Sequence, residues 1–215
     1  MGWSLPDGTY WWLYSKPGVP AVLGGVFQGS FVAMNGNFSS PAGHDFNLEL
    51  LGVRPLLVAG SYAEKASFGG TGTIPAATVD GVATSFPITL GYDVRYESQP
   101  LNGGVPEGDF KGAVASPLRS TVAAVLKSKE SEKSKSASVT LDVSTASEEC
   151  RLEGSLTASN ASLLIYTVVL APVSGVCPFP MLRPGSAYFD RDTRKLHVVV
   201  PGFANTDALV FVGSL

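Results

Sequence analysis

Two histidines, His44 and His197, are the residues whose chemistry best suits catalysis or metal binding. A zinc site needs histidine, cysteine or carboxylate ligands at short, regular spacing, and neither histidine has such neighbours. A Ser-His-Asp triad assembles from distant positions, so a hydrolase built on either histidine is a marginal alternative, although no Gly-x-Ser-x-Gly motif is present. The sequence therefore predicts no catalytic residue, no metal ligand and no cofactor, and it favours a protein that is not an enzyme.

An aromatic cluster near the N-terminus is the other group able to bind a ligand. The string D-G-T-Y-W-W-L-Y-S follows a turn signal and is expected to form a strand. Alternation along that strand puts Tyr10, Trp12 and Tyr14 on one face and Trp11 and Leu13 on the other. Aromatic faces stack sugars and line lipid cavities, so the first three are candidate ligand-binding residues. Packing in a core is the alternative, and residue type favours it.

The two cysteines, Cys150 and Cys177, stand 27 positions apart. Between them, Cys150–Thr157 alternates apolar and polar residues, and Leu163–Leu170 is a continuous apolar run bounded by Pro172, so the cysteines bracket two successive strands. This arrangement predicts a disulfide in an exported protein. Two separate buried thiols are the alternative.

Composition predicts an all-β protein. Charged residues make up only 15% of the chain, and 24 glycines and 15 prolines interrupt it at short intervals. A net charge of −3 gives no basic face for nucleic acid. No apolar stretch is long enough to span a bilayer, and the first residues lack the pattern of a signal peptide. The protein is therefore either cytosolic or exported by a signal that this chain lacks, and a disulfide would favour export.

The first half of the chain is expected to form one β unit, residues 1–103. Turn signals include Asn35-Gly36 and Pro41-Ala42-Gly43. After the aromatic strand, further strands are expected at Ala21–Phe27, Ser30–Phe38, Asp45–Leu51, Leu56–Ala63, Ser67–Ile74, Ser85–Ile88 and Leu90–Tyr96. Pro87 argues for a strand edge or a break at that point.

A second β unit, residues 104–215, is expected after the turn-rich segment Gln99–Gly108. A short helix is expected from Ser120, and the mixed-charge run Lys127–Ser136 is interpreted as a hairpin tip, with contact to an anionic membrane or lipopolysaccharide as the alternative. The remaining strands are expected at Ser138–Val143, at the cysteine-bracketed pair, and at Ser186–Asp190, Lys195–Val200 and Ala208–Val212. The two units are predicted to be antiparallel and barrel-like or sandwich-like.

A faint repeat suggests an internal duplication of the two units. Leu48-Glu49 and Tyr62 stand the same distance apart as Leu152-Glu153 and Tyr166. Two matches of this kind also arise by chance.

The C-terminal string G-S-A-Y-F-D-R-D-T-R-K-L-H-V-V-V-P-G-F-A-N-T-D-A-L-V-F-V-G resembles the ending of an uncharacterised family of proteobacterial envelope lipoproteins. The family also resembles this chain at D-G-T-Y-W-W-L-Y-S, at N-F-S-S-P-A-G-H-D-F-N-L-E and at both cysteines. Two departures stand out: Ala208 replaces a usual glycine, and the glycine-aromatic strand that opens the first unit is missing. Its counterpart in the second unit is Gly108–Gly112. The gap suggests an N-terminal truncation, or the loss of a signal peptide and lipid-anchored cysteine.

The resemblance implies a location in the periplasm or anchored to the outer membrane, and it implies no reaction. We therefore expect a non-enzymatic envelope lipoprotein module that binds a protein or another envelope component, with no nucleic-acid partner and with membrane contact only through a lipid anchor absent from this chain. The alternative is a carrier of an apolar small molecule or glycan in a β-barrel cavity, lined by Tyr10, Trp12 and Tyr14.

Overall fold

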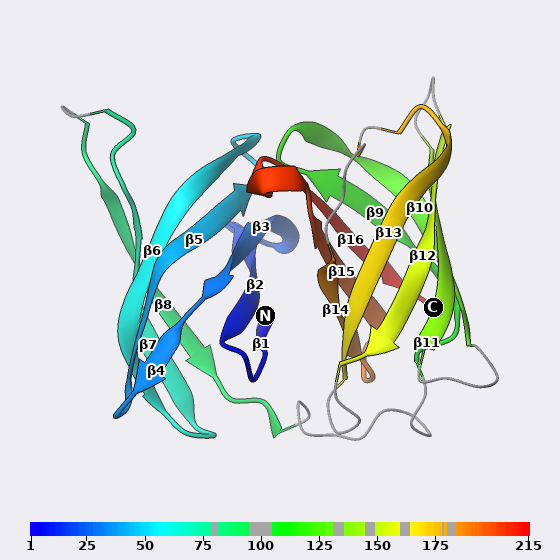
Figure 1. Ribbon diagram of the computed structural model, residues 1–215. Helices are drawn as coiled ribbons and strands as arrows, with labels where there is room; N and C mark the ends of the chain where they lie inside the picture. The colour runs from blue at the N-terminus through cyan, green and yellow to red at the C-terminus, as the bar shows by residue number, and fades with distance from the viewer. Residues whose placement is uncertain are drawn as a thin grey trace. The chain divides into compact units, whose positions relative to one another are not determined.

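A computed structural model describes residues 1–78, 81–94, 105–130, 136–144, 149–159, 164–177, 179 and 184–215. The chain forms two compact units, Met1–Val94 and Arg95–Leu215. The regular structure of these residues consists almost entirely of strands, β1 to β16, with a 3-10 helix at Phe203–Asn205, which confirms the predicted all-β fold (Figure 1). The predicted boundary segment lies mostly outside the described residues, as do residues 131–135 of the mixed-charge run.

The first unit is an open antiparallel sheet in the order β1-β2-β3-β5-β6-β7-β8, with β4 paired to β5. The sheet is curled, because rings on β2 and β3 contact rings on β7 and β8 across its inner face. Its strands are β1 Gly2–Ser4, β2 Thr9–Lys16, β3 Val19–Ser30, β4 Val32–Met34, β5 Asn37–Asn47, β6 Gly52–Ala63, β7 Ser67–Ile74 and β8 Thr84–Gly91.

The second unit is a closed barrel of eight antiparallel strands. Each strand pairs with the next along the chain, and the barrel closes because β9 pairs with both β10 and β16. Closure removes the free edges that an open sheet leaves. The strands are β9 Gly108–Ser116, β10 Arg119–Glu130, β11 Ser136–Ser144, β12 Glu149–Ala158, β13 Ile165–Gly175, β14 Gly185–Asp190, β15 Lys195–Pro201 and β16 Ala208–Ser214.

Side chains fill the barrel. Its core cluster takes alternate residues from all eight strands, as the period of a β-strand requires. The largest members are almost completely buried and include Phe110, Leu126, Leu141, Leu152, Leu156, Tyr166 and Phe211. An eight-stranded barrel is just wide enough for such side chains to occupy its interior.

A disulfide joins Cys150 of β12 to Cys177, two residues after β13, and confirms the predicted pairing. The two strands are neighbours in the barrel, so the bridge fastens the end of one hairpin. Such a bond fits an oxidising, extracytoplasmic location.

Pro41, Pro87 and Pro172 are among the prolines that lie inside strands, and at these three positions the sequence predicts turns, edges or strand ends. Pro41 belongs to β5, whose pairing with β6 shifts register between Ser40 and Gly43. Pro172 belongs to β13, beside a register shift on β12. Pro87 lies in β8 at the sheet edge, so the expected edge is confirmed but the two strands expected around it are one. Bulges and edges tolerate proline because its missing N–H breaks no ladder there.

The helix expected from Ser120 is wrong, because Arg119–Glu130 is strand β10, paired on both sides. This segment is a strand because every second residue faces the core, namely Val122, Ala124 and Leu126.

The strand expected at Asp45–Leu51 also ends early. It stops at Asn47, and a turn follows in which Leu51 has a φ of 49°. Leu48-Glu49 therefore lies in a turn, whereas Leu152-Glu153 lies within β12, so the apparent repeat does not join equivalent positions.

Candidate functional site

The candidate aromatic residues lie on β2 as predicted, with Tyr10 and Trp12 in the core of the first unit. Tyr10 is 0% exposed and Trp12 is 4% exposed. Trp11 and Leu13, on the opposite face, are also buried, so both faces of this strand are covered. Tyr14 is less buried and belongs to a polar cluster.

The rings on the inner face pack against one another. Tyr10 stacks on Trp12 with 4.2 Å between ring centroids, and Trp12 meets the edge of Phe68 at 4.8 Å. Phe68 in turn stacks on Phe38 at 3.8 Å. These contacts are a core arrangement, and a ligand-binding role for Tyr10, Trp12 and Tyr14 remains a prediction.

Glycines opposite the tyrosines give their rings room. Gly25 pairs with Tyr14, and a Cβ on Gly25 would lie 2.2 Å from the Tyr14 hydroxyl oxygen. Gly29 pairs with Tyr10, and a Cβ there would lie 2.6 Å from the Tyr10 hydroxyl oxygen. The tyrosines therefore lie flat across β3, and Tyr10 reaches Ser40 of β5 with 3.1 Å between hydroxyl oxygens.

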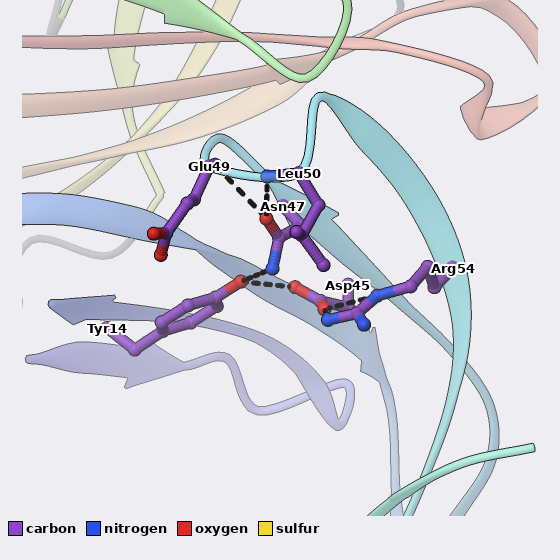
Figure 2. Close-up of polar contacts among 6 residues, drawn as sticks. All are labelled: Tyr14, Asp45, Asn47, Glu49, Leu50 and Arg54. Atoms are coloured by element: carbon purple, nitrogen blue, oxygen red, sulfur yellow. Dashed lines mark hydrogen bonds and ion pairs between the residues drawn. The ribbon is translucent and has the colours of Figure 1, made fainter. Parts of the chain in front are cut away.

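Tyr14 reaches across β3 to a buried carboxylate on β5 (Figure 2). Its hydroxyl donates to Oδ1 of Asp45 at 2.6 Å. The other carboxylate oxygen, Oδ2, accepts from Arg54 Nε at 3.1 Å and from Arg54 Nη2 at 2.5 Å. Asp45 and Arg54 are directly paired on β5 and β6, and their side chains are 1% and 35% exposed. We call Tyr14, Asp45 and Arg54 the polar clamp, because it links β2, β5 and β6.

Asn47 extends the polar clamp into the β5–β6 turn. Its amide Nδ2 donates to the Tyr14 hydroxyl at 3.0 Å, while its Oδ1 accepts from the backbone N–H groups of Glu49 and Leu50 at 3.1 and 2.6 Å. Figure 2 shows these bonds converging on one side chain. A side chain that satisfies two backbone donors in this way fixes the turn.

The chemistry of the polar clamp is structural. Burial and the neighbouring Asp45 carboxylate raise the pKa of Tyr14, so its phenol stays protonated and donates a hydrogen bond. Both carboxylate oxygens of Asp45 already accept hydrogen bonds from Tyr14 or Arg54. The three groups hold strands together and leave no activated nucleophile.

Among the described residues, no hydrogen bond joins either histidine to a serine or a carboxylate. His44 on β5 is half-buried and packs near Phe46, and burial lowers its pKa. His197 on β15 is 5% exposed, and burial lowers its pKa to about 4. Neither ring nitrogen of His197 has a hydrogen-bond partner in the described part of the chain, so the hydrogen bonds that define a triad are not made there.

The described ranges contain no group of three or more histidine, cysteine or acidic residues placed to hold a metal ion. They also contain no helix that is long and apolar enough to cross a membrane. A cavity of about 460 Å³ lies in the second unit beside Cys150, lined by Asp142, Glu149 and Arg151 among others. Arg151 is already paired with Asp142 at 2.7 Å, so the described residues that line the cavity offer no unpaired cation.

Sequence reasoning missed the polar clamp. The strands that carry these residues were expected, and Asp45 and Asn47 occupy alternate positions on one of them. Their proximity to Tyr14, however, depends on the pairing register and on Gly25, which leaves room for the ring across β3. Polar residues at inward positions of an otherwise apolar strand are the signal that could have indicated it.

Comparison of the chain with protein-family models, with curated proteins and with solved structures finds no match. The resemblance to envelope lipoproteins therefore stays a prediction, and the geometry of the two units is the basis for a function.

Proposed function

We propose that this chain is a non-enzymatic module of the bacterial cell envelope, attached as a lipoprotein, that binds a protein or another envelope component. The observation that carries the proposal is the contrast between a filled, disulfide-bonded barrel and an open sheet in one chain. A filled barrel is rigid and can support a neighbouring unit. An open sheet has unpaired edge strands and an incompletely covered face, to which a partner can bind.

Two further observations support the proposal. The Cys150–Cys177 bond fits the oxidising side of the inner membrane. The charged and hydroxyl groups of the polar clamp are already satisfied by one another, so they support a structural role better than a catalytic one.

The redox state of the cysteines in living cells tests the location. Cells expressing the protein from its own gene are quenched in acid, and free thiols are trapped with a maleimide that adds mass. We expect no added mass until the protein is reduced. Two trapped thiols before reduction would show a reducing compartment and would contradict the proposal.

A carrier of an apolar small molecule or glycan is the second candidate, and one observation favours it. Several inner-face rings of the first unit, among them Phe27, Phe31, Phe68 and Phe86, are only partly buried. Native mass spectrometry of protein purified from the envelope distinguishes the two. The mass of the protein with its covalent lipid alone is the expected result, and an additional stoichiometric small-molecule adduct that is lost on denaturation would favour the carrier. Hydrolysis of an ester panel that is lost in His44→Ala or His197→Ala would contradict both.

A further inference from the structure

Strand β8 forms one edge of the first unit's sheet. It pairs with β7 over all of its eight residues, and no described strand pairs with its other side. The corresponding last strand of the second unit, β16, pairs with β15 and with β9. A strand paired on one side leaves backbone N–H and C=O groups that can bind a further strand.

The inner face beside this edge is apolar and incompletely covered. Phe86 and Leu90 of β8 are only partly buried, whereas Leu209 and Phe211 on β16 are 0% exposed. The barrel strand that covers β16 is β9, and the described part of the first unit has no equivalent beside β8. An added strand with apolar residues on its inner side would bury these rings and supply backbone partners at the same time.

Strand β9, which covers β16 in the barrel, shows which side chains an added strand beside β8 would need on its inward face. Phe110 and Val114 point into the core, and Phe110 meets Phe189 edge-on with 5.9 Å between ring centroids. Gly112, between them, allows close approach, because a Cβ there would lie 2.0 Å from the Val212 carbonyl oxygen. The pattern is an aromatic residue, a glycine and an aliphatic residue at alternate positions.

We propose that the free edge of β8 binds an extended segment of a partner protein by strand addition, and that this segment carries aromatic, small and aliphatic residues at alternate positions. The inference rests on the proposed function, since it names the partner of a binding module. The partner's backbone extends the sheet, and its inward side chains cover Phe86 and Leu90.

Pro87 indicates which backbone groups face the partner. Alternate residues of an edge strand direct their N–H groups toward and away from the neighbouring strand. Pro87 has no N–H, yet β8 keeps its pairing with β7 on both sides of it. The N–H position of Pro87 therefore faces the free edge, and residues at alternate positions from it, such as Thr89, direct their N–H groups to the same edge. The Thr89 side chain is exposed, so its replacement disturbs no core contact.

The test uses the full chain and a labelled peptide with the sequence of residues 108–116, blocked at both ends, in a fluorescence anisotropy titration. Thr89→Pro removes a donor at the free edge and puts a ring in the partner's path, while Thr89→Val keeps the donor. We expect Thr89→Val to bind like the original chain. Loss of one net hydrogen bond of about 1 kcal/mol predicts binding at least about fivefold weaker for Thr89→Pro.

A second peptide, with its phenylalanine replaced by aspartate, is expected to bind at least about tenfold more weakly, since a charge would enter the apolar inner face. Circular dichroism checks that both variants are folded. If Thr89→Pro does not fold, amide exchange of β8 in the original chain replaces it, and the peptide should slow that exchange.

Equal affinity of the two Thr89 variants would overturn the inference, as would the absence of any peptide binding. A dimer that Thr89→Pro dissociates would also overturn it, because the occupant of the edge would then be a second copy of the chain. Thiol trapping in cells does not depend on the β8 edge. A failed peptide titration with oxidised cysteines therefore removes only this inference, whereas reduced cysteines remove the proposed location.

Discussion

Both units of this chain are curved antiparallel sheets, but their strands are held together in different ways. The second unit pairs its first and last strands and fills the barrel with aliphatic and aromatic side chains. The first unit leaves its sheet open, lays tyrosine rings across glycines, and links β2, β5 and β6 through the polar clamp. A sheet without closure relies on cross-strand contacts of this kind to keep its strands in register.

This difference suggests that the second unit provides stability and the first unit provides the binding surface. A closed sheet has no edge on which a partner strand could add, so the barrel suits the role of a support. The open sheet ends at β1 and β8, and β8 combines an edge with partly buried apolar side chains on its inner face.

Removal of the disulfide has the largest expected effect. Replacing Cys150 and Cys177 with serine should destabilise the second unit by roughly 3.5 kcal/mol, because the unfolded chain gains the freedom of the loop that the bond closes. All three tryptophans, Trp3, Trp11 and Trp12, lie in the first unit, so their fluorescence follows that unit alone. In urea, the far-ultraviolet circular dichroism transition should shift more than the fluorescence transition. Equal shifts would contradict separate roles for the two units.

Opening the polar clamp should affect the first unit next most strongly. Asp45→Ala leaves Arg54 and Tyr14 without their acceptor, and we expect a loss of about 2 to 3 kcal/mol, moderated because Arg54 can regain water. Tryptophan fluorescence in urea measures it. Asp142→Ala is the matched control, because Asp142 and Arg151 form an exposed ion pair, whose loss should cost much less than that of the buried pair. Asp142 lies in the second unit, so circular dichroism in urea measures this control. A similar loss in both variants would remove any special role for the clamp.

Alternation identified much of this fold in advance. The aromatic strand, the cysteine-bracketed pair and the last three strands were expected from alternation or from short apolar runs between turns, and the structure has a strand at each place. Errors gathered at Pro41, Pro87 and Pro172, because sequence alone does not distinguish a proline that ends a strand from one at a bulge or an edge.

The candidate site was less predictable than the fold. The face shared by Tyr10, Trp12 and Tyr14 follows from alternation, but the Asp45–Arg54 pair depends on which residues of β5 and β6 lie opposite each other. Register is set by tertiary pairing, including a bulge near Pro41 that the sequence did not indicate.

Filling the space above a glycine tests how the open sheet is held. Gly25→Ala puts a methyl group against the Tyr14 hydroxyl, and we expect a loss of about 1 to 3 kcal/mol in the first unit from overpacking. Gly69→Ala is the control, because nothing lies within 4 Å of its added Cβ and alanine costs less entropy than glycine in a strand. Thermal melts followed by fluorescence compare them. A stable Gly25→Ala would show that the tyrosine has another position.

Acid should weaken the second unit through His197, by a smaller amount. Burial lowers the folded pKa of His197 to about 4 from an ordinary value of 6.5, so the unfolded chain binds the proton more tightly. The stability from the neutral ring is present above pH 6.5 and is lost as the pH falls toward 4. We expect a loss of about 1 kcal/mol between pH 8 and pH 5.5, measured by urea unfolding followed by circular dichroism. An unchanged pH dependence in His197→Leu would exclude this histidine as the cause.

Amide hydrogen exchange across the whole chain tests most directly the claim that one unit is open and the other closed. The account predicts that amides of β8 exchange at least about tenfold faster than those of β16, since β16 is paired on both sides and β8 on one. Adding the peptide with the sequence of residues 108–116 should slow β8 and leave β16 unchanged. Protection of β8 equal to that of β16 in the free protein would contradict the account, because the edge would then already be covered.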